Sequence, residues 1–374
     1  MIYLDYAATT PMSVESIDIY AQVATSFYGN PNSLHDIGSS AAGLLEKSRA
    51  ELASILSCEA EGIYFTSGGS DANITALASM ISAHQYKGNH LITSVLEHSS
   101  ILNFFKKMEG QGFDVTYLPI NSEGLINPEV VQEAITEQTI LASIQHVNGE
   151  IGVIQHVARI GEILAERNVL FHCDAVQSLG KIPIDIKTAQ LDSLSISSHK
   201  IYGPKGVGAA YMNPSIKWNA QIPGTTHEGG FRAGTVDVPG IVAFVTSTNA
   251  VCNDMMKERI RIKRLRGRLL DHMASYACPF VMEGSVTHGI PDVLGLRIPR
   301  MEGQYIMLEC NRYGIAISTG SACQVGSQAP SQVMLALGRT EVEAKQLIRL
   351  SFGKYTTMED VQKTAVVLRN IVEK

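Results

Sequence analysis

Short apolar runs alternate with amphipathic segments along the first two thirds of the chain. The apolar runs, which we predict to be buried strands, lie at residues 62–67, 89–97, 139–147, 168–173 and 191–197. After the first run, apolar residues recur at helical spacing and share one face, at Ile74, Leu77, Met80 and Ile81. Residues 157–167 follow the same helical pattern. Continuous apolar strands between amphipathic helices indicate an α/β domain with a largely parallel sheet.

The pattern changes near residue 255, where a long charged helix begins. Shorter apolar segments and a C-terminal amphipathic helix follow it, which is typical of a smaller α+β domain. A chain of 374 residues is long enough for two domains, because single cores stop growing near ~250–300 residues. We therefore predict a large domain over residues 15–255 and a small domain built from residues 1–14 and 256–374.

Composition narrows the function classes. The net charge of −6 does not favour a nucleic-acid surface, and the basic run at residues 257–268 has the spacing of a solvated helix face. No apolar run reaches the ~20 residues that a membrane helix needs, and the N-terminus lacks a signal pattern. None of the six cysteines forms a C-x-x-C pair, so we predict no metal site and a reduced, cytoplasmic protein.

Polar residues follow the predicted strands in an ordered way. Ligands of open α/β sheets bind beyond the carboxyl ends of the strands. A glycine turn at residues 68–73 that opens a helix could seat a phosphate on its free N–H groups. The next strand ends are followed by His98, by the polar turn 148–152, by Asp174, and by Lys200. Each of these features alone is more often structural, but together they favour a cofactor site.

Those groups suit pyridoxal phosphate. This cofactor needs a lysine for its Schiff base, an acid beside its pyridine nitrogen and a phosphate-binding turn. Lys200 and Asp174 are 26 residues apart in the sequence, which leaves room for one connection between neighbouring strands.

Several motifs spread over the chain resemble one family. They are YLDYAATTP, YGNPNSLH, HVNGEIGVIQ, FHCDAVQSLGK, SSHKIYGPKG, FRAGT and IRLSFGK. Together they resemble the class V aminotransferases, and more narrowly the cysteine desulfurases of the NifS/IscS type. The resemblance runs from Asp5 to about Lys354. It implies the aspartate aminotransferase-like fold of pyridoxal-phosphate enzymes, in which a mainly parallel, seven-stranded-type sheet is joined to a smaller α+β domain.

The resemblance implies roles for residues at the matching positions. Lys200 would hold the cofactor, Asp174 would pair with its ring nitrogen, Gln177 would bond its phenolic oxygen, and His98 would stack on the ring and transfer protons. The predicted phosphate contacts are Gly69, Ser70, Ser197, His199 and, across a homodimer interface, Thr235. Arg349 would bind the substrate carboxylate, and Asn148 would contact substrate or cofactor.

Cys323, in STGSACQVGS, matches the catalytic cysteine of the family, which lies on a mobile loop in those relatives. The resemblance implies that it takes the sulfur of L-cysteine as a persulfide and passes it to an acceptor protein, for iron–sulfur cluster or other sulfur-containing cofactor assembly. A transaminase has no need for this thiol. Selenocysteine lyase activity, another class V reaction and an inactive scaffold of the same fold are the alternatives.

Two features depart from the family pattern. Gly149 stands where a second asparagine is usual, so Arg349 is expected to carry more of the substrate binding. The chain ends at Lys374, soon after the last predicted helix, whereas longer relatives use a further tail to dock an iron–sulfur scaffold. The acceptor is therefore either such a scaffold or a dedicated iron–sulfur enzyme such as a quinolinate synthase.

Overall fold

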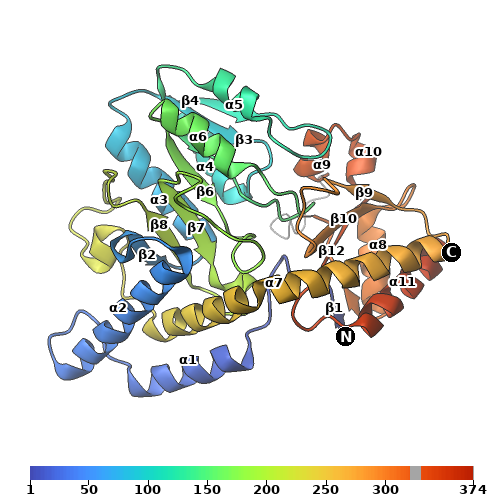
Figure 1. Cartoon of the computed structure of the whole chain (residues 1–374), viewed down its shortest axis with the longest axis horizontal. Helices are drawn as coiled ribbons and strands as arrows, with labels where there is room; N and C mark the ends of the chain where they lie inside the picture. The colour runs from blue at the N-terminus through green and yellow to red at the C-terminus, as the bar shows by residue number, and fades with distance from the viewer. Residues whose placement is uncertain (321–329, 374) are drawn as a thin grey trace.

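The computed structural model describes residues 1–320 and 330–373. Two sheets of different size lie on either side of the molecule, and the long helix α7 (Val238–Ser275) passes along both (Figure 1).

The larger sheet has seven strands in the order β2-β8-β7-β6-β5-β3-β4, and only β8 runs antiparallel to its neighbours. The strands are β2 (Ile63–Thr66), β3 (His90–Ser94), β4 (Asp114–Leu118), β5 (Thr139–Ser143), β6 (Leu170–Asp174), β7 (Ser193–Ser197) and β8 (Gly208–Met212). The predicted runs correspond to β2, β3, β5, β6 and β7. The apolar pattern missed β4, an edge strand with only Leu118 fully buried, and β8, whose residues are mostly small.

Helices cover both faces of this sheet, which explains why its central strands are apolar throughout. One face packs on α3 (Gly69–His84) and α4 (Ser99–Gly110). The other packs on α2 (Asp36–Leu56), α5 (Pro128–Ala134), α6 (Val157–Glu166) and the first half of α7, while α1 (Val14–Ser26) packs on α7. The expectation for Ile74 is wrong: it is 42% exposed, and α3 lies on the sheet through Ala72 and Ala76 instead.

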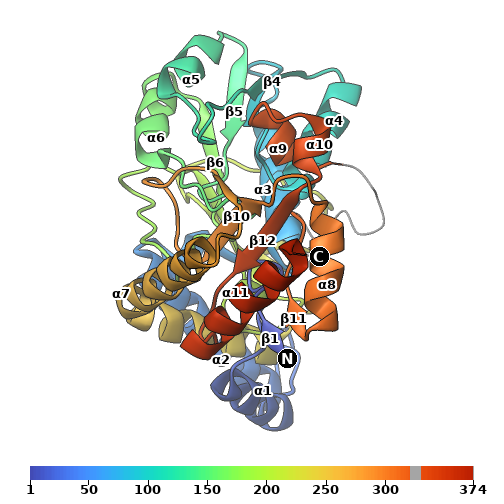
Figure 2. The same ribbon diagram turned by 90° about the vertical axis from the view of Figure 1, so that its right-hand side faces the viewer.

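The second sheet is antiparallel, in the order β12-β10-β9, and a parallel pair of β1 (Ile2–Tyr3) and β11 (Ile315–Ala316) lies beside it. Its strands are β9 (Val281–Glu283), β10 (Val293–Arg297) and β12 (Leu347–Ser351). Figure 2 shows α8 (Gly303–Arg312) and α11 (Met358–Val372) along this sheet, with α9 (Gln332–Ala336) and α10 (Glu341–Ala344) above it. Three short 3₁₀ helices complete the fold, η1 (Ala60–Gly62), η2 (Ser198–Lys200) and η3 (His227–Gly230).

Helix α7 belongs to two hydrophobic cores. Val238, Ile241 and Phe244 near its start join the core of the large sheet, whereas Leu265 and Leu269 join the core of the small one. The helix runs without a break through residues 255 and 256, so the boundary that we predicted there lies inside one continuous element. The division into 15–255 and 1–14 with 256–374 stays a prediction. Within the described residues, no helix is both long and apolar enough to cross a membrane.

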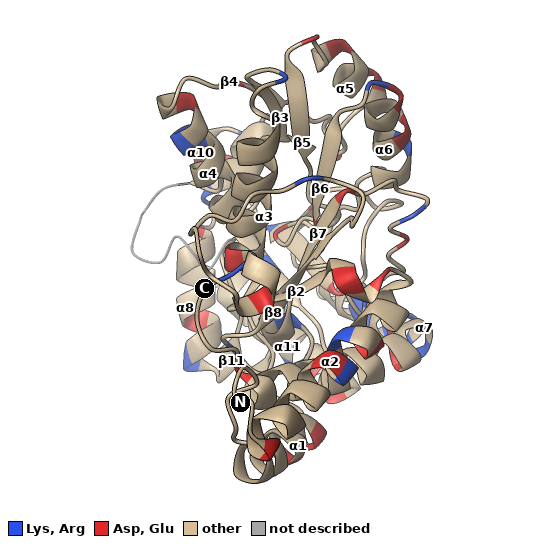
Figure 3. Cartoon of the chain, turned by 90° about the vertical axis from the view of Figure 1, so that its left-hand side faces the viewer, with Lys and Arg blue, Asp and Glu red and all other residues tan. Residues whose placement is uncertain are grey.

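The basic run at residues 257–268 is only partly a solvated face. Lys257, Lys263 and Arg264 are exposed. Arg261 instead donates to the carbonyls of Thr356 and Gly353, and Arg266 donates to that of Ile290. Acidic and basic positions are mixed along α2 and α7 in Figure 3. These arginines therefore fasten α7 to the small sheet.

Candidate active site

A cavity of about 750 Å³ lies at the carboxyl ends of the central strands, facing β12. Among the lining residues are ten that the sequence singled out: Gly69, Ser70, His98, Asn148, Asp174, Gln177, Ser197, His199, Lys200 and Arg349. Thr235 is exposed and is not one of the lining residues. Cys323 lies outside the described residues. Residues spread over more than 280 positions of the sequence thus meet at one edge of the sheet, as the strand-end argument predicts.

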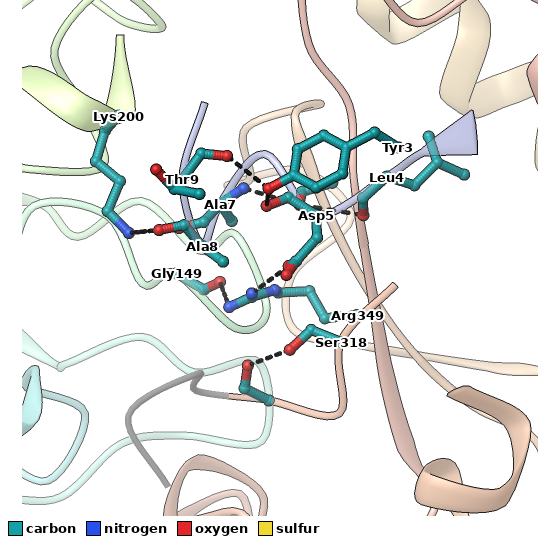
Figure 4. A network of polar contacts seen from close by, with 12 residues as sticks. Tyr3, Leu4, Asp5, Ala7, Ala8, Thr9, Gly149, Lys200, Ser318 and Arg349 are labelled. Carbon is teal, nitrogen blue, oxygen red and sulfur yellow. Dashed lines mark hydrogen bonds and ion pairs between the residues drawn. The ribbon is translucent and has the colours of Figure 1, made fainter. Parts of the chain in front are cut away.

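Lys200 is the last residue of η2, directly after β7. Its Nζ donates to the carbonyl oxygens of Ala7 (2.6 Å) and Ala8 (2.8 Å), as Figure 4 shows. Tyr3 holds the same N-terminal turn, because its hydroxyl donates to the carbonyls of Asp5 and Thr9. The first residues of the chain therefore fix the ammonium at the cavity wall.

Arg349 on β12 lies across the cavity from the sheet. Its Nη2 lies 2.7 Å from Oδ1 of Asp5, and its Nη1 donates to the carbonyl of Gly149 at 3.1 Å (Figure 4). Its Nε is buried and has no hydrogen-bond partner among the described residues. The side chain is 3% exposed, so a bound carboxylate would satisfy a buried cation with little competition from water.

The turn before α3 forms a cradle for an anion. Gly68 has φ +144°, and among the described residues no side chain caps the helix that follows. A Cβ on Gly69 would lie 2.6 Å from Cγ2 of Val176, so only glycine fits there. Ser197 adds a buried hydroxyl without a hydrogen-bond partner in the described part of the chain. Uncapped N–H groups, the helix dipole and this hydroxyl suit a phosphate.

Asp174 ends β6 and is 6% exposed. Its Oδ1 accepts from the Val176 N–H at 2.9 Å, and its Oδ2 accepts from Nδ2 of Asn73 at 2.8 Å. His98 begins α4 as its N-cap, and its Nδ1 accepts from the Ser100 N–H. Both side chains are thus held by hydrogen bonds before any ligand binds.

Gln177 is oriented by Lys181, whose Nζ donates to Oε1 of Gln177 at 2.7 Å. The amide nitrogen then acts as the donor and bonds the Ala7 carbonyl at 3.0 Å. Gly149 lies beside this amide, because a Cβ at position 149 would be 3.0 Å from Nε2 of Gln177. Burial lowers the pKa of Lys181 to about 8.

Asn148 lines the cavity but holds its own turn together. Its Oδ1 accepts from the N–H groups of Glu150 and Ile151, and its Nδ2 donates to the Leu96 carbonyl. The predicted contact of Asn148 with substrate or cofactor stays a prediction, and only the amide nitrogen has a hydrogen left for it.

Two titratable groups of the cavity have strongly shifted pKa values. Burial, reinforced by the ammonium groups of Lys200 and Lys205, lowers the pKa of His199 to about 4. This imidazole is therefore neutral near pH 7 and can still donate one N–H. Burial raises the pKa of Glu97 to about 8, and the charge of Asp174 adds to the rise. Glu97 is therefore largely a neutral acid near pH 7.

The described cysteines do not supply a reactive thiol. None of Cys58, Cys173, Cys252, Cys278 and Cys310, the cysteines in the described part of the chain, lines the cavity. Burial raises the pKa of every one of them above its ordinary value, which disfavours the thiolate.

Sequence reasoning missed Asn73, Ser100 and Lys181. Asn73 was part of the glycine turn motif, and its place four residues after Gly69 on a helix was the one available signal that it faces the site. Ser100 follows His98 by two residues, which is a capping distance. Nothing in the sequence marked Lys181 as the partner of Gln177.

The family model for class-V aminotransferases matches residues 2–364. A protein of Bacillus subtilis strain 168 that carries the name cysteine desulfurase NifS is 46% identical over 365 residues, covering 97% of this chain and 92% of its relative. Cysteine desulfurase IscS of Neisseria meningitidis serogroup C is 37% identical over 376 residues, covering 100% of this chain and 92% of the relative.

Solved structures agree with these relatives. A NifS-like protein superimposes with a TM-score of 0.93 at 29% identity, covering 100% of this chain and 99% of that one. SspA in complex with cysteine superimposes with a TM-score of 0.82 at 30% identity, covering 96% of this chain and 100% of that one. The fold and the cavity define a class V aminotransferase-type enzyme. The chain belongs to the class-V aminotransferase family and lies close to its NifS and IscS members.

Enzymes of this family depend on pyridoxal phosphate, and the cavity fits that cofactor. The cradle at Gly68 and Gly69 and the unpartnered hydroxyl of Ser197 fit its phosphate. The Asp174 carboxylate is placed for its ring nitrogen, and Lys200 is the lysine of the same cavity. The expected fold class and the expected cofactor are both confirmed.

Proposed function

We propose that this protein is a cysteine desulfurase that converts L-cysteine to L-alanine and carries the released sulfur on Cys323. The observation that carries the proposal is the meeting of Lys200, Asp174, His98 and Arg349 in one cavity. The relatives that are named cysteine desulfurases support it, and so does the similarity to SspA, whose structure is a complex with cysteine.

When bound, pyridoxal phosphate withdraws electrons from the substrate's α-carbon. Asp174 would hold the ring nitrogen, with its carboxylate fixed by Asn73 and Val176. Gln177 would donate to the phenolic oxygen through Nε2, since Lys181 occupies its Oε1. Gly69, Ser70, Ser197 and His199 would hold the phosphate.

Lys200 is the base placed to move the proton of the substrate's Cα. The carbonyls of Ala7 and Ala8 accept from its Nζ, so this nitrogen has a defined position when it takes and returns the proton. Arg349 would bind the substrate carboxylate, with its other donors fixed on Asp5 and Gly149. Substrate binding thereby orients Cα toward the lysine.

Sulfur transfer would use Cys323 as the nucleophile. Its thiolate forms an S–S bond to the substrate sulfur while the Cβ–S bond breaks, and the electron pair of that bond stays with Cβ, which takes up a proton. The net change is L-cysteine plus a thiol to L-alanine plus a persulfide, so no external oxidant is needed. The raised pKa values of the described cysteines leave Cys323 as the candidate thiol.

The proposal includes a homodimer in which the partner subunit's Thr235 completes the phosphate site. The exposure of Thr235 supports this, because an exposed hydroxyl can reach a second subunit. The acceptor of the sulfur would be an iron–sulfur scaffold or a dedicated iron–sulfur enzyme such as a quinolinate synthase, in the cytoplasm. Size-exclusion chromatography with light scattering tests the dimer, and a monomer with full activity contradicts it.

Alanine release from L-cysteine tests the function. The purified protein should be yellow and should release alanine and sulfide, and Lys200→Ala should lose both the visible absorption band and the activity. Release of selenium but not sulfur would indicate a selenocysteine lyase, and keto-acid formation would indicate a transaminase. A colourless wild-type protein without cofactor would overturn the proposal.

A further inference from the structure

A buried hydrogen-bond network connects Asp174 to His98. It begins at the Asp174 carboxylate, whose oxygens can only accept. Nδ2 of Asn73 lies 2.8 Å from Oδ2 of Asp174, so the amide of Asn73 must present its NH₂ group to the carboxylate. Asn73 is 1% exposed, which leaves water little access to this contact.

The orientation of the Asn73 amide fixes the rest of its contacts. Its Oδ1 must accept from Nε2 of His172 at 3.1 Å, so His172 carries its proton on Nε2. The other ring nitrogen of His172 then accepts from the Ser193 hydroxyl at 3.0 Å. Burial lowers the pKa of His172 to about 3, in agreement with a neutral ring. All three strong hydrogen-bonding positions of the Asn73 amide are therefore directed by the protein.

Ser100 extends the network to His98. The second N–H of Asn73 points to Oγ of Ser100 at 3.2 Å, so this hydroxyl accepts there and has its own proton to donate. Nδ1 of His98 lies 2.8 Å from the same hydroxyl. The backbone N–H of Ser100 also donates to Nδ1 of His98 at 3.2 Å. Two donors from one residue therefore converge on one nitrogen of the imidazole.

We propose that Asn73 and Ser100 are positioning residues that hold the neutral imidazole of His98 in the tautomer with its proton on Nε2. The inference rests on the proposed function only for its consequence, namely that His98 brings an N–H donor to the cofactor and substrate. Nδ1 is occupied by two protein donors, so it does not serve as the base. The same network ties the ring acid Asp174 to His98 through two side chains.

Helix geometry reinforces the tautomer. His98 is the N-cap of α4, and its Nδ1 takes the place of the side-chain oxygen that usually caps a helix. A capping atom must accept, and the positive end of the helix dipole favours an electron pair there over a proton. The capping N–H alone would allow some rotation of the ring. The Ser100 hydroxyl adds a second donor from the side of Asn73, which defines both the tautomer and the ring orientation.

Nitrogen NMR of the holoenzyme with ¹⁵N-labelled histidine rings tests this inference. The signals of His98 are assigned by their loss in His98→Gln. We expect a pyridine-type signal for Nδ1 and a pyrrole-type signal for Nε2 in the wild type. Ser100→Ala should shift both signals toward the average of two exchanging tautomers, and Ser100→Thr, which keeps the hydroxyl, should restore them. Ser40→Ala, an exposed serine early in α2, is the matched control and should change neither.

Kinetics add a second readout. Ser100→Ala should lower kcat for alanine release about fivefold, the effect of one ordinary hydrogen bond, with little change in KM. A wild-type His98 with its proton on Nδ1, or ring shifts that are identical in wild type and Ser100→Ala, would overturn the inference. The NMR result does not depend on turnover, so a protein that shows the expected shifts but releases no alanine supports the positioning role and contradicts the proposed function alone.

Discussion

The guanidinium of Arg349 lies 2.7 Å from the carboxylate of Asp5, although the two residues are 344 positions apart. This ion pair joins β12 of the small sheet to the N-terminal turn that also holds Lys200 (Figure 4). The substrate-binding cation and the proposed base are therefore positioned by the same few residues at the start of the chain.

Arg349→Lys should raise KM for L-cysteine about 10- to 100-fold, because one ammonium cannot bind Asp5, the Gly149 carbonyl and a substrate carboxylate together. The visible absorption should persist, since the cofactor contacts are elsewhere. Steady-state alanine release measures the effect, and Arg159→Lys on the exposed side of α6 is the control. An unchanged KM would remove Arg349 from substrate binding.

Gly149→Asn should lower KM for L-cysteine about two- to tenfold by restoring an amide beside the substrate. The backbone at position 149 does not have positive φ, and the nearest contact is the end of the flexible Gln177 side chain, so the protein should fold. Gly149→Ala separates bulk from hydrogen bonding, since it adds the Cβ without the amide. A KM that rises equally in both variants would show that the space, not the missing amide, matters.

Lys181→Met should shift the visible absorption band of the bound cofactor, because Gln177 loses the donor that fixes its amide. Free rotation would place Oε1 against the phenolic oxygen part of the time. Absorption spectra over a pH series measure this, with exposed Lys187→Met as the matched control. Spectra that overlay those of the wild type at every pH would show that Gln177 is held by other contacts.

Glu97→Gln should remove a loss of stability that the wild type shows as the pH rises. The folded pKa of about 8 exceeds the ordinary value of 4.5, so the folded state holds the proton more tightly than the unfolded state. Stability therefore falls between pH 4.5 and about 8. The difference in Tm between Glu97→Gln and wild type should grow through this window in favour of the variant. Exposed Glu137→Gln is the control, and a difference that is constant with pH would contradict the assignment.

The sequence predicted the parts of the fold that have a strong period. Strands β2, β3, β5, β6 and β7 and helix α11 were found from apolar patterns, whereas β4 and β8 were missed because an edge strand and a run of small residues carry little signal. Likewise, the strand ends and the family motifs predicted ten residues that line the cavity. The partners of those residues were not predictable, because contacts such as Asn73 with Asp174 and Arg349 with Asp5 join distant positions through the tertiary fold.

Mass spectrometry of the Cys323 peptide after a single turnover tests the central claim most directly. The enzyme is mixed with less than one equivalent of L-cysteine that carries a heavy sulfur isotope, without reductant, and alanine is quantified in the same sample. The account predicts one labelled sulfur atom on Cys323 for each alanine formed, and neither product from Lys200→Ala. Alanine formed in equal yield by Cys323→Ser, or the label on another cysteine, would contradict it.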